Sequence, residues 1–144
     1  MNITLKTEYA LLALYEVFMN NNNNKPVSRR QIVEHYNISE HFLEKILIEL
    51  QKKELIRSVR GPGGGFISNK KPDEITLWDI FTAVDFPDYS EHRCYPKSTN
   101  GCTIRDKCHV KNIWFRFGKS MKDSMSAITL SELTKDENFM EHTV

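Results

Sequence analysis

The sequence predicts a mainly α-helical fold with one small β-hairpin and a long helix toward its C-terminal end. Two short helical patterns follow each other across a turn of three or four residues, and a glycine-rich reversal between two short apolar strands comes next. Farther along, apolar side chains recur at helical spacing from residue 108 to about residue 127. This order of elements is that of a winged helix-turn-helix domain followed by one further long helix.

The composition limits the size of the core and the class of partner. A chain of 144 residues with 40% hydrophobic content can build one or at most two small cores. The net charge of +1 says nothing by itself about nucleic acid, but residues 52–71 carry six cations against one anion. No apolar run approaches the roughly 20 residues of a membrane span, and the N-terminus lacks a signal-peptide pattern. We therefore expect a cytoplasmic protein with no membrane contact.

The first two helices are predicted from periodicity and capping residues. Apolar residues recur on one face over residues 7–19, and the asparagine run at 20–24 is expected to form a loop. Ser28 is the expected N-cap of a second helix over residues 29–36. Asn37 can end that helix in the left-handed conformation.

A third helix and a hairpin complete the predicted DNA-binding unit. The helix is expected over residues 40–53 with Ser39 as its N-cap, and the two strands over 56–59 and 66–68. Two short helices joined by a tight turn and followed by a hairpin form a winged helix-turn-helix. The apolar face of the third helix consists of Phe42, Leu43, Ile46, Leu47 and Leu50.

The hairpin turn is the most informative stretch of the chain. It reads Arg60-Gly61-Pro62-Gly63-Gly64-Gly65, with four glycines and a proline in five positions, which favours a tight, exposed backbone that approaches another molecule closely. Arg60 could then enter the minor groove of DNA, as the wing of such a domain does. An ordinary glycine-rich turn or a phosphate loop is the alternative. A Walker loop, however, would end in Gly-Lys-Ser/Thr, and no Gly-x-Gly-x-x-Gly opens a helix here.

The second half of the chain divides into three parts. Residues 72–84 predict a loop and a short helix with Thr76 as its N-cap. Residues 85–107 show little periodicity and are expected to form a long loop without secondary structure, which something outside the loop must hold in place. The helical stripe that follows is too apolar for a lone surface helix, which favours a dimerisation helix over purely intramolecular packing. The stripe consists of Val110, Ile113, Trp114, Phe117, Met121, Ser124 and Met125.

These observations divide the chain into a winged helix-turn-helix domain at residues 1–84, a cysteine-bearing loop at 85–107, and a dimerisation helix with a C-terminal tail at 108–144. The loop and the start of the helix hold all three cysteines of the chain, Cys94, Cys102 and Cys108. Their spacing lacks the Cys-x2-Cys pairs of a zinc finger.

Three thiolates can instead hold three corners of an iron–sulfur cluster. Cys108 is placed at the start of the expected helix, where the macrodipole favours a thiolate. Three reduced structural cysteines, or a thiol switch without metal, are the alternatives. Basic neighbours that would offset the charge of a cluster are Arg93, Arg105, Lys107 and Lys111.

Several motifs together resemble one known family. They are the opening Leu5-Lys6-Thr7-Glu8-Tyr9-Ala10-Leu11, Ile38-Ser39 with Phe42-Leu43-Glu44-Lys45, the stretch from Leu55 to Phe66, Ile75-Thr76-Leu77-Trp78-Asp79-Ile80, the three cysteines, and Thr129-Leu130-Ser131-Glu132-Leu133. The chain resembles the Rrf-type family of bacterial winged-helix transcriptional regulators, which includes iron–sulfur cluster sensors of the IscR, NsrR and RirA types. The stretch around the wing is the most specific of these motifs.

The resemblance implies a homodimeric transcription factor that binds a palindromic operator in double-stranded DNA. By position, the recognition helix would present His41, Phe42, Glu44 and Lys45, and the wing Arg60 and Gly61. Lys45 can reach a guanine edge or a phosphate, and Glu44 can accept from cytosine and so act as a selectivity filter.

The other expected DNA contacts are less specific. Phe42 could touch a thymine methyl group, although its place in the apolar stripe fits core packing at least as well. Arg29 and Arg30, in the first turn of the preceding helix, would grip phosphate and fix the register on DNA.

The resemblance also bears on the fourth ligand of a cluster, which in relatives is not a cysteine. Glu8 of the partner subunit matches the acidic ligand position of some relatives. The alternative is that Glu8 only interacts with the macrodipole at the N-terminus of its own helix. The histidine position of other relatives, the third residue after the last cysteine, is Lys111 here. His92 and His109 are weaker candidates. Three cysteines and one other ligand suit a two-iron or a four-iron cluster, and the spacing slightly favours the latter.

The expected function is a repressor that senses nitric oxide, iron or redox state through the cluster. The alternative is a cluster-free winged-helix regulator controlled by a protein partner or by cysteine oxidation. An enzyme is not expected, because the sequence has no nucleophile–base arrangement of recognisable spacing and no cofactor loop. The pattern does not distinguish the sensed signals, nor whether the loaded or the empty form binds DNA.

Overall fold

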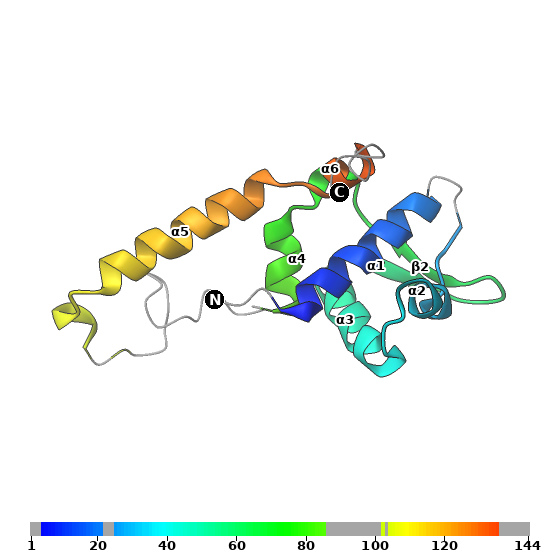
Figure 1. Cartoon of the computed structure of the whole chain (residues 1–144), viewed down its shortest axis with the longest axis horizontal. Coiled ribbons are helices and arrows are strands. Elements are labelled where there is room, and N and C mark those ends of the chain that lie inside the picture. The colour runs from blue at the N-terminus through cyan, green and yellow to red at the C-terminus, as the bar shows by residue number, and fades with distance from the viewer. Residues whose placement is uncertain (1–3, 22–24, 86–101, 103, 136–144) are drawn as a thin grey trace, which may run out of the picture.

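Helix α1, Leu5–Asn21, forms the centre of the packed body (Figure 1). The computed structural model describes residues 4–21, 25–85, 102 and 104–135. Helices α3 (Glu40–Lys52) and α4 (Leu77–Val84) and the second strand of the hairpin all contact α1. Its buried face alternates small and branched side chains, which lets these neighbours approach closely. That face includes Ala10, Ala13, Leu14 and Val17, each at most 1% exposed.

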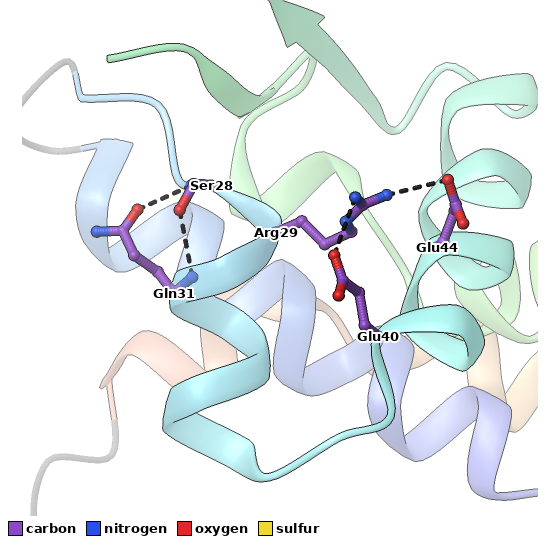
Figure 2. Close-up of polar contacts among 5 residues, drawn as sticks. All are labelled: Ser28, Arg29, Gln31, Glu40 and Glu44. Carbon is purple, nitrogen blue, oxygen red and sulfur yellow. Dashed lines mark hydrogen bonds and ion pairs between the residues drawn. The ribbon is translucent and has the colours of Figure 1, made fainter. Parts of the chain in front are cut away.

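Helix α2, Arg29–Tyr36, has the bounds and caps that the sequence predicted. The Ser28 hydroxyl accepts a hydrogen bond from the Gln31 amide at 3.2 Å, and the Gln31 side chain accepts one from the Ser28 amide at 2.8 Å (Figure 2). This reciprocal capping box satisfies two amides that a helix start leaves without partners. Asn37 ends the helix at φ 52° and ψ 42°, which is the left-handed conformation.

Helix α3 begins at the predicted residue and ends one residue earlier than predicted, at Lys52. The prediction that Ser39 caps this helix is confirmed only for its position, because its side chain forms no capping hydrogen bond. Instead the Ser39 carbonyl accepts from the Leu43 amide at 2.9 Å, so the backbone alone starts the helix. The buried stripe of α3 packs into the body through Leu43, Ile46, Leu47 and Leu50.

The hairpin consists of β1 (Ile56–Val59) and β2 (Gly65–Ser68), paired antiparallel so that Val59 lies opposite Gly65. The second strand begins one residue before the predicted start. A short bridge fixes the hairpin to the chain before α2: the Val27 amide donates to the Phe66 carbonyl at 3.0 Å, and the Phe66 amide donates to the Val27 carbonyl at 2.8 Å. The wing and the helix-turn-helix are therefore attached directly.

The 3₁₀ turn η1 (Pro72–Glu74) leads into α4, whose start is capped as predicted. The Thr76 hydroxyl accepts from the Asp79 amide at 3.1 Å, and the Asp79 carboxylate accepts from the Thr76 amide at 2.9 Å. The backbone at Thr76 also pairs with Thr129, and this pairing holds α6 (Leu130–Lys135), the last helix of the described residues, on the body.

Helix α5, Lys111–Ala127, extends away from the body and runs back toward α6 (Figure 1). It begins three residues after the predicted start at Cys108. Residues Arg105–Lys107 form the 3₁₀ turn η3, and the first helical hydrogen bond runs from the Trp114 amide to the Val110 carbonyl at 3.2 Å. Gly118 and Met125 are its buried residues. Among the described helices, none is long and apolar enough to cross a lipid bilayer.

Asp85, at the end of α4, ties this helix to the start of α1. Its carboxylate accepts hydrogen bonds from the Thr4 hydroxyl, from the Thr4 amide at 3.1 Å and from the fully buried Thr7 hydroxyl at 2.5 Å. Partial burial alone would raise the pKa of Asp85, but these hydrogen bonds and the charge of Lys6 outweigh it and lower the pKa below its ordinary value. The cysteine-bearing loop, residues 85–107, begins at this contact.

Replacing Asp85 with Asn should lower the stability of the fold by about 1–2 kcal/mol at pH 7, the order expected for hydrogen bonds to a charged group. A carboxylate with a lowered pKa contributes stability above its unfolded pKa of about 3.9, and this contribution disappears as the pH falls through the folded value. The difference between Asp85→Asn and the wild type should therefore be constant from pH 7 to about 5 and shrink below about 4. Urea unfolding at several pH values measures it. Asp123→Asn, in an exposed pair with Lys119, is the control with little effect; a difference that does not depend on pH would contradict the assignment.

Replacing Gly65 with Ala should destabilise the fold by about 2–3 kcal/mol. A Cβ atom at Gly65 would lie 2.3 Å from the Val27 carbonyl oxygen, so the bridge between hairpin and helix-turn-helix has to open. Gly63 has a φ of +74° but no atom within 4 Å of a Cβ, so Gly63→Asn, which tolerates this φ, should cost less than about 1 kcal/mol. Denaturant midpoints of the two variants give the comparison, and equal midpoints would show that the bridge is not needed.

Candidate DNA-binding interface

The start of α3 presents three of the predicted DNA-contacting residues to solvent. His41, Glu44 and Lys45 are all exposed, while the opposite face of the helix is buried in the body. This division follows from the 3.6-residue period, which separates the residues of the apolar stripe from those between them. A helix with one face fixed in a core can present the other to a DNA groove without moving.

Phe42 has a different environment from its neighbours. Its ring is partly buried against the core and meets the ring of Tyr9 edge-to-face, with centroids 5.7 Å apart and an angle of 77° between the planes. Edge-to-face packing of this kind stabilises the contact between two helices. The placement supports the packing alternative for Phe42 over a contact with a thymine methyl group.

Arg29 lies at the start of α2 and forms ion pairs with two glutamates of α3 (Figure 2). One terminal nitrogen is 3.0 Å from Glu44, and the other is 3.0 Å from Glu40. The sequence had suggested a phosphate contact for Arg29 and had given Glu40 no role. Pairing between residues 11 and 15 positions apart depends on the angle between the helices, which a local pattern does not reveal.

Arg30, the next residue, points into solvent and pairs within its own helix. Its Nε atom lies 2.7 Å from the Glu34 carboxylate, four residues later, and its side chain is 86% exposed. An exposed i,i+4 pair is weak and competes little with a phosphate. Arg30 thus keeps the freedom that a phosphate contact requires.

The tip of the wing presents Arg60 and Gly61, both exposed. Gly61 and Gly63 have φ angles of +104° and +74°, which side chains rarely adopt. Gly64 serves a different purpose, because a Cβ there would lie 2.3 Å from the Val59 carbonyl oxygen. The glycine string therefore combines a special backbone turn with close packing inside the hairpin.

The basic residues around the wing are exposed as expected. Lys53, Arg57, Lys70 and Lys71 are solvent-accessible, and Lys52 is exposed but pairs with Glu49 at 2.9 Å. Such a cationic surface supplies the sequence-independent part of DNA affinity.

Two of the three cysteines lie within the described residues. Cys102 and Cys108 are half-buried free thiols on either side of η3, and Cys94 lies outside the described residues. The expected help from a helix dipole at Cys108 is wrong, because α5 begins at Lys111 and the dipole acts only near the first turn. Across residues 4–21, 25–85, 102 and 104–135, no three His, Cys, Asp or Glu side chains come together as a metal site.

Glu8 is exposed in the first turn of α1, at the rim of an apolar groove of about 710 Å³. The groove runs between α1, α4 and α6 and is lined by residues such as Leu11, Leu77 and Leu133. This position fits the helix-dipole interpretation of Glu8 and does not test the ligand interpretation.

A family model for Rrf2, described as an iron-dependent transcriptional regulator, matches residues 3–136. The chain belongs to the Rrf2 family. It is 33% identical over 141 residues to the HTH-type transcriptional regulator IscR of Sodalis glossinidius, covering 98% of this chain and 83% of that protein.

Solved structures share the fold. T. potens IscR superposes with a TM-score of 0.72 at 24% identity, covering 100% of this chain and 93% of the other. CymR, the global cysteine regulator of B. subtilis, gives 0.69 at 24% identity, covering 94% and 97%. Membership of this family identifies the protein as a winged-helix DNA-binding transcriptional regulator. The relatives it matches are regulators rather than enzymes.

Replacing Arg60 with Ala should weaken DNA binding about tenfold and lower the salt slope of binding by about one, because a cation placed in a minor groove releases counterions. The probe is a duplex recovered by selection from a randomised double-stranded DNA library, titrated at several salt concentrations. Lys122→Ala, exposed on α5, is the matched control and should bind as the wild type does. Equal binding by Arg60→Ala and the wild type would remove Arg60 from the interface.

Proposed function

We propose that this regulator is a homodimeric repressor whose binding to a palindromic operator is controlled by an iron–sulfur cluster. Cys94, Cys102 and Cys108 would hold the cluster, and Glu8 of the partner subunit would supply the fourth ligand. In this assignment residues 1–84 bind DNA, the loop at 85–107 carries the cluster together with Cys108, and residues 108–144 hold the helix that forms the dimer. A four-iron cluster is favoured over a two-iron one, and nitric oxide, iron or redox state is the signal.

The carrying observation is the pair of free, half-buried thiols of Cys102 and Cys108 in a family described as iron-dependent. Thiolate sulfur is the donor that iron–sulfur clusters require, and partial burial limits access of water and oxidants to it. The described cysteines fit such a group. When bound, the cluster would supply a reactive inorganic centre, while the chain supplies sulfur donors and shielding.

The dimer is supported by the outer face of α5. Ile113, Trp114 and Phe117 are 66%, 53% and 50% exposed, although they are large and apolar. An apolar surface of this kind on a helix that extends from the body is typical of a subunit interface. Two copies paired along α5 would present two recognition helices to the half-sites of a palindrome.

Glu8 offers a route from the cluster to DNA. It lies on α1, which packs directly against the recognition helix α3, with Tyr9 contacting Phe42. Loss of a ligand on α1 could therefore shift α3 relative to its counterpart in the dimer. A small change in half-site geometry is enough to weaken specific binding strongly.

Anaerobic purification tests the cluster. The wild-type protein should be coloured, with a visible absorption band and with iron and sulfide in equal amounts, and iron per chain distinguishes four-iron from two-iron clusters. Cys102→Ser and Cys108→Ser should each lose most of this iron, because a missing thiolate leaves an iron site without its strong ligand. Glu8→Ala should retain iron but lose it faster to nitric oxide, oxygen or a chelator.

DNA titrations of the loaded and iron-free forms, with mass measurements in solution, complete the test. The loaded form should have twice the mass of one chain and a different operator affinity from the iron-free form. Colourless anaerobic protein without iron would refute the cluster. If its DNA binding then responded to a thiol oxidant, the cysteine-oxidation alternative would replace it.

A further inference from the structure

We propose that Arg29 determines base specificity as a positioning residue: by holding Glu40 and Glu44 of α3 together, it fixes the direction in which the Glu44 carboxylate meets the DNA bases. This inference rests on the DNA-binding function and assigns Arg29 a different role from the phosphate contact predicted by the sequence. The observation behind it is the double ion pair between α2 and α3 (Figure 2).

The geometry is that of one planar cation between two carboxylates. Arg29 Nη1 lies 3.0 Å from Glu44 Oε1, and Arg29 Nη2 lies 3.0 Å from Glu40 Oε1. Glu40 and Glu44 are four residues apart, so they share one face of the helix. A guanidinium is planar and rigid, and here Arg29 donates a hydrogen bond to Glu44 and forms an ion pair with Glu40, so one side chain holds both carboxylates.

The anchor of this arrangement is rigid on both sides. Arg29 follows Ser28, whose capping box with Gln31 fixes the start of α2. Glu40 and Glu44 stand on α3, which is held by its buried stripe. The Arg29 side chain is also less exposed than its neighbour, at 39% against 86% for Arg30. Because the helices on both sides of the contact are fixed, Arg29 holds the two carboxylates in place and does not move with them.

Charge explains why Arg29 stays paired with Glu40 and Glu44 when DNA approaches. The three side chains together carry a net charge of −1 at the start of the recognition helix. Turning Arg29 to a phosphate would leave two adjacent carboxylates without their cation beside a polyanion, where they repel each other and the DNA. Exposed cations such as Arg30 and Lys45 can meet phosphate without that penalty.

The consequence concerns base reading. The hydrogen bond from Arg29 goes to Oε1 of Glu44, which leaves the lone pairs of Oε2 to accept a hydrogen bond from a cytosine amino group. Without Arg29 the carboxylate would turn freely about its side-chain torsions, and the repulsion from Glu40 would direct it away. Binding would then lose discrimination at one base pair in each half-site.

Selection from a randomised double-stranded DNA library, followed by sequencing of the bound duplexes, tests this role. The wild type should yield a palindromic consensus. Arg29→Met should relax the preference at one base pair per half-site by about tenfold, at the position that Glu44→Gln also relaxes. The double variant should relax it no further, because the two side chains act as one unit. Arg30→Met is the matched control: it removes an exposed cation from the same helix that pairs only with Glu34 among the described ion pairs, so it should weaken binding to all sequences alike and keep the wild-type consensus.

Arg29→Lys separates positioning from phosphate contact. A lysine keeps the charge that a phosphate contact needs but cannot hold two carboxylates in a fork, so it should give the relaxed consensus with the wild-type salt slope. An unchanged consensus in either Arg29 variant overturns the proposal. So does uniform weakening on all sequences with a slope reduced by about one in Arg29→Met. If Arg29→Met does not fold, as judged by circular dichroism, the result with Arg29→Lys decides. If the wild type itself selects no consensus, the DNA-binding function fails and the inference fails with it.

Discussion

The two hydrogen bonds between Val27 and Phe66 are the constraint on which the DNA-binding face depends. They join the hairpin to the chain that leads into α2, so the wing and the helix-turn-helix move as one body. The bridge requires Gly65, because no side chain fits between its backbone and the Val27 carbonyl. Gly65 is therefore required by the fold itself and not only by contact with DNA. The position of the wing relative to α3 is set before any DNA binds.

The attached wing would let two elements share the work of binding, the basic hairpin and the start of α3 with its paired carboxylates. The hairpin side offers exposed cations, with Arg57 and Arg60 on the wing itself, which would supply affinity that does not depend on DNA sequence. The start of α3 carries Glu40 and Glu44, and in the proposed reading mode these carboxylates would repel phosphate and permit approach only where base contacts compensate. Arg29 reduces this repulsion without abolishing it. On this proposal, affinity and selectivity would come from different elements, and a substitution in one need not change the other.

Local signals in the sequence were sufficient for most of the fold. Ser28, Asn37 and Thr76 act through neighbours within four residues, so their helix boundaries could be predicted. The start of α5 could not, because its apolar stripe begins before the backbone becomes helical. In the candidate site, too, features set by neighbouring residues could be predicted, and features set by the packing of helices could not. Exposure of Lys45 and Arg60 follows from periodicity and turn chemistry, whereas the Arg29 ion pairs depend on the angle between α2 and α3.

The contacts of α1 offer a physical path by which the cysteine-bearing loop could act on DNA binding. The loop begins at Asp85, which is hydrogen-bonded to Thr4 and Thr7 at the start of α1, and it ends before α5. Glu8 lies one residue beyond Thr7, and Tyr9 contacts Phe42 of the recognition helix. A displacement of the loop would therefore pull on the same turn of α1 that touches α3. Because one face of α1 is buried along the helix, α1 would transmit such a displacement as a rigid helix, and a change in the cysteine-bearing loop would reach α3 as a tilt.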